Sequence, residues 1–241
     1  MTTWLYNEGG FPSGMACGKI REMRPELAFK NVKKENITLS PSVPYSPPER
    51  FIAAFCGDRR IYGGDTFESE VTVTQFVHED GNLSTTSMRT DIAERENTDI
   101  FLTLTHEALK KRFKDAMGSD VVLMFDDEAA MGTWTRDLDK IFKEKYGYDL
   151  CDYLPYVLPG SEPKTRKQQQ ARSDYAMLCG ELICSNYFIP MREWLGKNGM
   201  KSTGHLGGEN KASSYTPYDT ETVWIYSAAI MYPELTLYGV R

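Results

Sequence analysis

Val121-Val122-Leu123-Met124-Phe125-Asp126-Asp127-Glu128 is the stretch of sequence that decides the fold. Its first five residues form a continuous apolar run, which is typical of a parallel strand that is buried on both faces. Three carboxylates follow at once, and functional groups in parallel β/α folds collect at the carboxyl ends of strands. The stretch therefore predicts a central parallel strand with candidate functional groups at its end.

Short apolar runs elsewhere predict the neighbouring strands of this sheet. They cover residues 3–6, 100–104 and 201–204. Periodic apolar residues predict amphipathic helices between these strands. The first helix covers residues 106–117 and is ended by Gly118. The second runs from an N-cap at Thr135 to a stop at Gly147. The third covers residues 163–198, is divided or kinked at Pro190 and is ended by Gly199. Alternating strands and helices in this order predict parallel β/α units.

The predicted fold class is α/β, a partial (β/α)8 TIM-barrel-type domain with a small inserted β-rich domain. Four barrel-type strands can be counted, whereas a closed barrel needs eight. Residues 1–28 and 98–241 are assigned to the barrel region, and residues 29–97 to the insertion. The insertion contains a proline-rich linker at Ser40–Pro48, strands over residues 51–56 and 71–77, and a hairpin turn over residues 78–82 that exposes His78.

Composition excludes several classes of protein and partner. The 241 residues are 41% hydrophobic and 26% charged, as expected of a globular protein with a substantial core. A net charge of -6 disfavours nucleic acid and anionic membranes as partners. No apolar stretch is long enough to span a bilayer, and no signal peptide is evident, so the chain as written is expected in the cytoplasm. The five cysteines are an odd number without CxxC pairs, and we interpret them as reduced thiols.

Polar clusters stand at the ends of the predicted strands. They are Asn7-Glu8, Thr105-His106-Glu107, Asp126-Asp127-Glu128, and His205 with Glu209. Together with Trp4 and Trp134 beside one mouth, they suit a polyhydroxylated ligand that stacks on aromatic rings. The sequence therefore predicts a carbohydrate as the partner.

Glycosidic bond cleavage needs two carboxyl groups, and Glu128 and Glu209 are the best-placed pair. The predicted substrate-binding residues are Trp4, Asn7, Glu8, His106, Glu107, Asp127, Trp134 and His205. Simpler interpretations stay open for several of them. The carboxylates 126–128 can cap the next helix or face water, and His205 can be a structural histidine beside a surface Glu209. His106 and Glu107 lie in a predicted first helical turn, which favours Glu in any case.

Four motifs resemble segments of bacterial glycoside hydrolases similar to the α-L-rhamnosidases of family 106. Residues 4–19, WLYNEGGFPSGMACGK, are similar to the family's W-x-Y-D-E-x-G-W-P-S-G-x-A-G-G. Thr105-His106-Glu107 matches T-H-E, residues 125–128 match F-x-D-E-P in all but the last position, and residues 203–209 match T-G-H-x-x-x-E. The chain departs from the pattern at Asn7 for Asp, Phe11 for Trp, Cys17 for Gly and Ala129 for Pro.

The resemblance implies a (β/α)8 catalytic domain, glycoside or polysaccharide substrates and a pair of acidic catalytic residues. Glu128 and Glu209 fall on the acidic positions of those motifs. No cofactor is required by the residues themselves, and the resemblance implies a calcium ion near the sugar, with no metal ligand assigned. Because family members are much longer, the chain is expected to be a fragment of an exported or intracellular enzyme, completed by another chain.

Two other functions compete with a hydrolase that uses a Glu pair. One is a non-catalytic carbohydrate-binding remnant that keeps the aromatic mouth without a competent acid pair. The other is a metal-dependent hydrolase built on His205, Glu209 and Asp127. Gly207 and Gly208 disfavour it, because they make unlikely the regular helix that would present residues 205 and 209 as i, i+4 ligands. Nucleotide-binding, zinc-protease and α/β-hydrolase motifs do not occur in the sequence.

Overall fold

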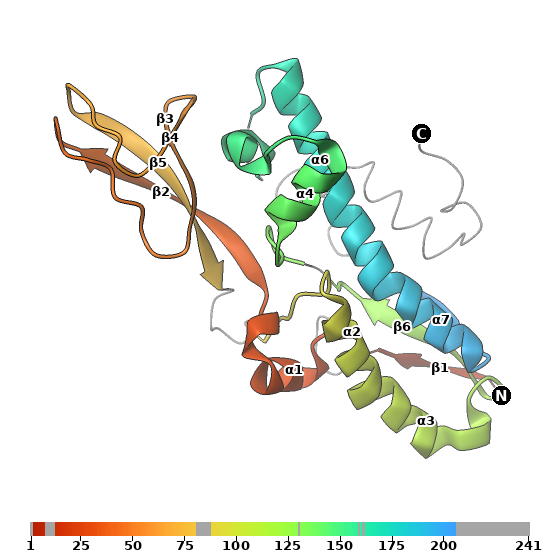
Figure 1. Cartoon of the computed structure of the whole chain (residues 1–241). Coiled ribbons are helices and arrows are strands. Elements are labelled where there is room, and N and C mark those ends of the chain that lie inside the picture. Colours follow the sequence, from red (N-terminus) through yellow and green to blue (C-terminus); the bar gives the residue numbers. More distant parts are fainter. Residues whose placement is uncertain are drawn as a thin grey trace.

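A computed structural model describes residues 2–7, 13–80, 88–129, 131–158, 160 and 162–205 (Figure 1). It shows a mixed α/β fold with a small parallel sheet, a separate antiparallel sheet and several helices. No helix of the described ranges combines the length and apolar character needed to cross a membrane.

The parallel sheet contains the strand that decides the fold at its centre. Its strands are β1 (Thr3–Tyr6), β6 (Val121–Asp127) and β7 (Lys201–His205), in the order β1-β6-β7. Tyr6 pairs with Phe125, and Phe125 pairs in turn with Thr203. Three of the four predicted barrel-type strands are therefore confirmed, and all three end at the same edge. The described part of the chain closes no barrel.

The α-helices of the described residues are α1 (Lys19–Met23), α2 (Arg95–Phe101), α3 (Glu107–Phe113), α4 (Leu138–Tyr146), α5 (Leu154–Val157), α6 (Arg166–Ile183) and α7 (Ile189–Lys197). Helices α3 and α7 pack on one face of the parallel sheet. Val121 and Met124 of β6 are buried against Leu195 of α7, with side chains of α3 beside them. A larger core joins α2, α4 and α6, with Tyr175 and Phe101 fully buried in it.

The prediction of a strand at residues 100–104 was wrong. These residues lie in a helix, because α2 continues through a π-helical turn, Leu102–His106, into α3. The hydroxyls of Thr103 and Thr105 donate to the carbonyls of Asp99 and Phe101, at 2.8 and 2.7 Å, so these β-branched residues are satisfied inside the helix. Burial of Phe101 outweighs the β-propensity of the run.

The other helix predictions need smaller changes. A second π-helical turn, Cys184–Phe188, separates α6 from α7, and Pro190 lies in the first turn of α7, where proline is tolerated. Helix α4 begins after Asp137, two residues beyond the predicted cap at Thr135, and ends at Gly147 as predicted. The division of the long helix at Pro190 and its end before Gly199 are both confirmed.

The antiparallel sheet falls within residues 29–97. Its strands are β2 (Lys30–Leu39), β3 (Phe51–Cys56), β4 (Arg59–Ile61) and β5 (Val71–Asp80), in the order β2-β5-β3-β4. Strand β5 runs to Asp80, so His78 lies in a strand and not in the predicted turn, and its half-buried ring contacts Trp134. The proline-rich segment before β3 is anchored by the buried Tyr45, whose amide donates to the carbonyl of Asp65 at 2.8 Å.

This sheet docks on the loop that follows β6. Trp134 N donates to the carbonyl of Lys30 at 3.3 Å, and Val32 N donates to Thr133 Oγ1 at 2.8 Å. Gly132 permits this approach, because a Cβ at that position would lie 1.7 Å from the carbonyl oxygen of Lys30. In Figure 1 the base of β2 therefore meets the body near α1, while the rest of the antiparallel sheet extends away from β1 and β6.

Candidate active site

Two adjacent carboxylates end the central strand and point to opposite faces of the sheet, as alternation along a strand requires. Asp126 faces the helices, where the hydroxyl of Tyr187 donates to its Oδ1 at 2.9 Å. Asp127 faces the other side, where it accepts a hydrogen bond from the hydroxyl of Tyr6. The end of β6 thus carries Asp126 on the face that packs against the helices and Asp127 on the opposite face, where Tyr6 lies.

Asp126 is the centre of a buried polar network. Besides Tyr187, the side-chain amide of Asn7 donates from Nδ2 to Asp126 Oδ1 at 2.7 Å. Loss of solvation raises the pKa of Asp126 to about 6, against the opposing effect of these hydrogen bonds. Burial, with the negative charge of Asp126 beside it, also raises the pKa of Tyr187 well above 10. Asp126 therefore links the end of β1 to the π-helical turn between α6 and α7.

Ser13 ties the loop after β1 to the end of β6. Its hydroxyl donates to the carbonyl of Asn7 at 2.6 Å and accepts from the amide of Asp127 at 2.9 Å. The amide of Ser13 in turn donates to the carbonyl of Asp127, also at 2.9 Å. These bonds fix the main chain on both sides of residues 8–12, so Asn7 and Asp127 stand side by side.

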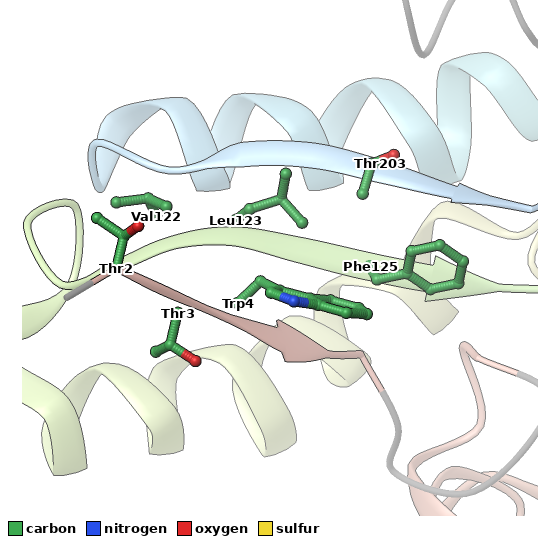
Figure 2. A pocket seen from close by; sticks show the side chains of 7 residues that line it. All are labelled: Thr2, Thr3, Trp4, Val122, Leu123, Phe125 and Thr203. Carbon is green, nitrogen blue, oxygen red and sulfur yellow. The ribbon is translucent and has the colours of Figure 1, made fainter.

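Aromatic side chains cover the sheet face opposite the helices. Tyr6 stacks on Phe125 with ring centroids 5.2 Å apart, and Trp4 lies 5.8 Å from the same ring. Trp4 is 56% exposed. Figure 2 shows Trp4 and Phe125 on this face, with Leu123 and Thr203 near them, around an open pocket of about 330 Å³.

Glu128 is the first residue beyond β6, and it has an unusual backbone. Its φ of 50° lies in the left-handed region, which is strained for a residue with a side chain. The side chain is half-buried. Backbone strain of this kind is concentrated at functional sites, because the surrounding structure must hold it in place.

Two predicted site residues, Glu8 and Glu209, lie outside the described part of the chain. The predicted barrel region beyond residue 205 lies outside it as well. His205 is the last residue of β7, and its main chain pairs with Asp127. The structure therefore brings Asn7, Asp127 and Glu128 to one end of the sheet, with β7 ending beside them, whereas Trp4 pairs with Leu123, four residues before Asp127.

His106 and Glu107 do not stand at a strand end. His106 is fully buried in the π-helical turn, edge-on to Trp194 at 5.0 Å, and burial lowers its pKa to about 3. Glu107 accepts a hydrogen bond from Trp194 Nε1 at 2.7 Å. Both residues therefore contact α7, behind the sheet, because the segment that carries them is helical.

Trp134 lies apart from Trp4. It is 4% exposed, and its ring meets His78 edge-on at 5.4 Å. The two residues line a second open pocket, of about 490 Å³, between the antiparallel sheet and the start of α4. The remaining lining residues are Lys30, Arg50, Thr135, Arg136, Asp137, Asp139 and Lys140. The two tryptophans therefore occupy separate pockets and not one mouth.

The described residues do not by themselves identify ligands for the calcium ion that the resemblance implies. They contain no group of three or more His, Cys, Asp or Glu side chains able to hold a metal ion. Asp126 and Asp127 cannot act as joint ligands, since their side chains point to opposite faces of β6.

Three residues of the network were missed by the sequence analysis: Tyr6, Ser13 and Tyr187. Tyr6 and Ser13 flank the Asn7-Glu8 cluster, so their position in the chain is a signal that could have indicated them. Tyr187 lies 61 positions from Asp126, and only the packing of the helix beside β6 brings it there.

A comparison with protein families covers three of the four motifs, those at residues 105–107, 125–128 and 203–209. A family model described as alpha-L-rhamnosidase, glycoside hydrolase family 106, matches residues 76–219, more than half of the chain. No curated protein matches. The solved structure of a rhamnosidase from Novosphingobium sp. PP1Y is similar at a TM-score of 0.42 and 18% identity, covering 61% of this chain and 15% of that one.

Proposed function

The chain belongs to the alpha-L-rhamnosidase family, glycoside hydrolase family 106, and from this premise we propose that it hydrolyses α-L-rhamnosidic bonds with Glu128 and Glu209 as the carboxyl pair. The observation that carries the proposal is the position of Glu128. It follows the central strand of the parallel sheet, in a strained backbone conformation, beside the tethered Asn7 and Asp127.

The chemistry requires one carboxyl group to protonate the leaving oxygen while the other acts on the anomeric carbon, directly or through water. Glu209 follows β7 by four residues, and β7 is the neighbour of β6, so the proposal places the pair on adjacent strand ends. Asn7, Glu8, Asp127 and His205 would bind sugar hydroxyls, and Trp4 would stack on a sugar ring. We assign His106 and Glu107 to the support of Trp194 and α7, without a substrate contact.

Completion of the sheet is part of the proposal. β1 and β7 are the outer strands of the described sheet, and each presents an unpaired edge there. The family relation implies further strands, from this chain or from another one, that would close the mouth over the sugar. We derive no step through a calcium ion.

Substitution of the two glutamates tests the proposal. Glu128→Gln and Glu209→Gln should each lower the rate of aryl α-L-rhamnoside cleavage by about 100-fold or more, because the amide neither donates nor accepts the proton. Glu144→Gln is the matched control, as Glu144 is exposed on α4. Thermal unfolding followed by circular dichroism should be alike for all of them. Full turnover in both variants would contradict the assignment.

A second candidate function is non-catalytic carbohydrate binding, which the exposed aromatic face favours. Trp4 and Tyr6 are both exposed next to Phe125, an arrangement that suits stacking on a sugar. This function predicts that L-rhamnose changes tryptophan fluorescence without product, and that Trp4→Ala removes the change. Trp194→Phe, which alters a tryptophan on the helical side, should keep the change. Release of free sugar by the unmodified chain would exclude this candidate.

A further inference from the structure

The pocket beside Trp134 is cationic, although the chain as a whole is acidic. Four of its lining residues are basic, namely Lys30, Arg50, Arg136 and Lys140, whereas two are acidic, Asp137 and Asp139. The chain has a net charge of -6, so this surface is a local excess of positive charge. A cleft with one sign of charge concentrates ligands of the opposite sign.

Lys30 and Arg136 have fewer close carboxylate partners than their donor groups could bind. Lys30 Nζ donates to the main-chain carbonyl of Glu26 at 3.0 Å, a neutral acceptor. Arg136 Nε lies 3.4 Å from Glu94 Oε1, and its charge also acts on the carboxylates of Glu26 and Asp137. Lys140, by contrast, is paired closely with Asp137. Lys30, whose charge also acts on the buried Asp91, and the exposed Arg136 are therefore the cations best suited to hold an anion.

The same pocket offers groups that suit a sugar ring. The edges of Trp134 and His78 provide an apolar wall, and Thr135 adds a hydroxyl group. Polar groups that converge on an aromatic wall are typical of ligand sites that fix orientation. The guanidinium of Arg136 is suited to a carboxylate, since its planar fork matches the two oxygens.

The pocket is close in the sequence to the candidate catalytic residue. Trp134 follows Glu128 by six positions, so the two Cα atoms lie at most about 21 Å apart. Gly132 and Thr133, just before Trp134, are anchored on β2.

We propose that this pocket binds a hexuronate unit of the glycoside, with Arg136 and Lys30 on its carboxylate and Trp134 and His78 against its ring. The inference rests on the proposed function for the nature of the ligand, and it narrows the substrates to acidic saccharides. In this proposal the residues of the pocket bind the substrate and take no part in the cleavage step.

Direct binding measurements test the proposal without requiring turnover. Ligand-observed NMR or calorimetry would compare glucuronate, glucose and inorganic phosphate as probes. Glucuronate should bind at least about tenfold more tightly than glucose, and added salt should weaken the binding of glucuronate. Arg136→Gln and Lys30→Gln should each weaken glucuronate about tenfold, as expected when a charged hydrogen bond is lost. Lys167→Gln, an exposed control on α6, should bind like the unmodified chain.

Three outcomes would overturn the inference. They are equal binding of glucuronate and glucose, glucuronate binding that both variants retain, and phosphate binding as tight as that of glucuronate, which would mean recognition of charge without the sugar. The Glu128→Gln variant separates this inference from the proposed function. It should lose cleavage while it keeps its affinity for glucuronate, so either idea can fail while the other stands.

Discussion

Asp126 and Asp91 are the two carboxyl groups at which burial matters most. Each is fully buried or nearly so, and loss of solvation raises the pKa of each to about 6. Such a group binds its proton more tightly in the folded chain than in the unfolded chain. Its contribution to stability is therefore most favourable below about pH 4 and is lost as pH rises through about 6.

Asp126→Asn tests this sign, because asparagine keeps the shape and an acceptor for Tyr187 but cannot ionise. The stability of the variant relative to the unmodified chain should rise between pH 4 and pH 7, by about 3 kcal/mol for a pKa raised by about two units. Chemical unfolding at a series of pH values measures this difference. Asp115→Asn, at an exposed position, should show no such trend, and parallel curves for Asp126→Asn would refute the burial argument.

At the scale of elements, the pairing of β6 with β7 depends on one glycine. A Cβ at Gly204 would lie 2.1 Å from the carbonyl oxygen of Asp126, which is main chain and cannot swing aside. The two strands approach closely at the point where the candidate carboxylates begin. A side chain there would push β7 away from Asp126 and Asp127.

Gly204→Ala should therefore destabilise the chain by about 3 kcal/mol or more, since overpacking of this severity forces the main chain to move. Gly196→Ala is a control for which the expected change in stability has the opposite sign. Gly196 lies in α7 with open space around it, so alanine should stabilise the helix by up to about 1 kcal/mol. Denaturant unfolding of both variants gives the comparison, and equal effects would contradict the steric account.

At the scale of the whole molecule, the antiparallel sheet is held on the body by a shared hydrophobic core, to which Phe55 and Phe76 belong, and by polar contacts. Lys30 pairs with Trp134. Arg60 of β4 bonds Asp149 at 2.9 Å and Asp152 at 2.6 Å. Arg60 is the less exposed member of both ion pairs, so solvent screens these contacts less than a surface pair.

Arg60→Gln should loosen this docking and increase hydrogen exchange in β3 and β4, while exchange in the parallel sheet stays unchanged. The adjacent Arg59 is the matched control. It is 71% exposed and pairs at 3.7 Å with Asp65, a residue of the segment between β4 and β5 and not of the body. Arg59→Gln should leave exchange unchanged throughout. Faster exchange spread equally over both sheets after Arg60→Gln would show that they unfold as one unit.

Much of the fold could be predicted wherever local pattern and burial agree. The apolar run at residues 121–125, the strands at 3–6 and 201–204, and the helix stops at Gly147 and Gly199 were all confirmed. Residues 100–104 were misread because a β-branched apolar run favours a strand locally. Their helix is stabilised by contacts with a partner, the π-helical turn that contains Tyr187, far away in the chain.

For the candidate site, the sequence by itself determined the strand-end carboxylates Asp126, Asp127 and Glu128, because alternation and chain direction put them at the end of β6. Only the tertiary structure decided which partners they meet. It separated Trp134 from Trp4, buried His106, and brought Tyr187 to Asp126. The physical reason is that strand ends follow from local periodicity, whereas burial and hydrogen-bond partners depend on the packing of segments many residues apart.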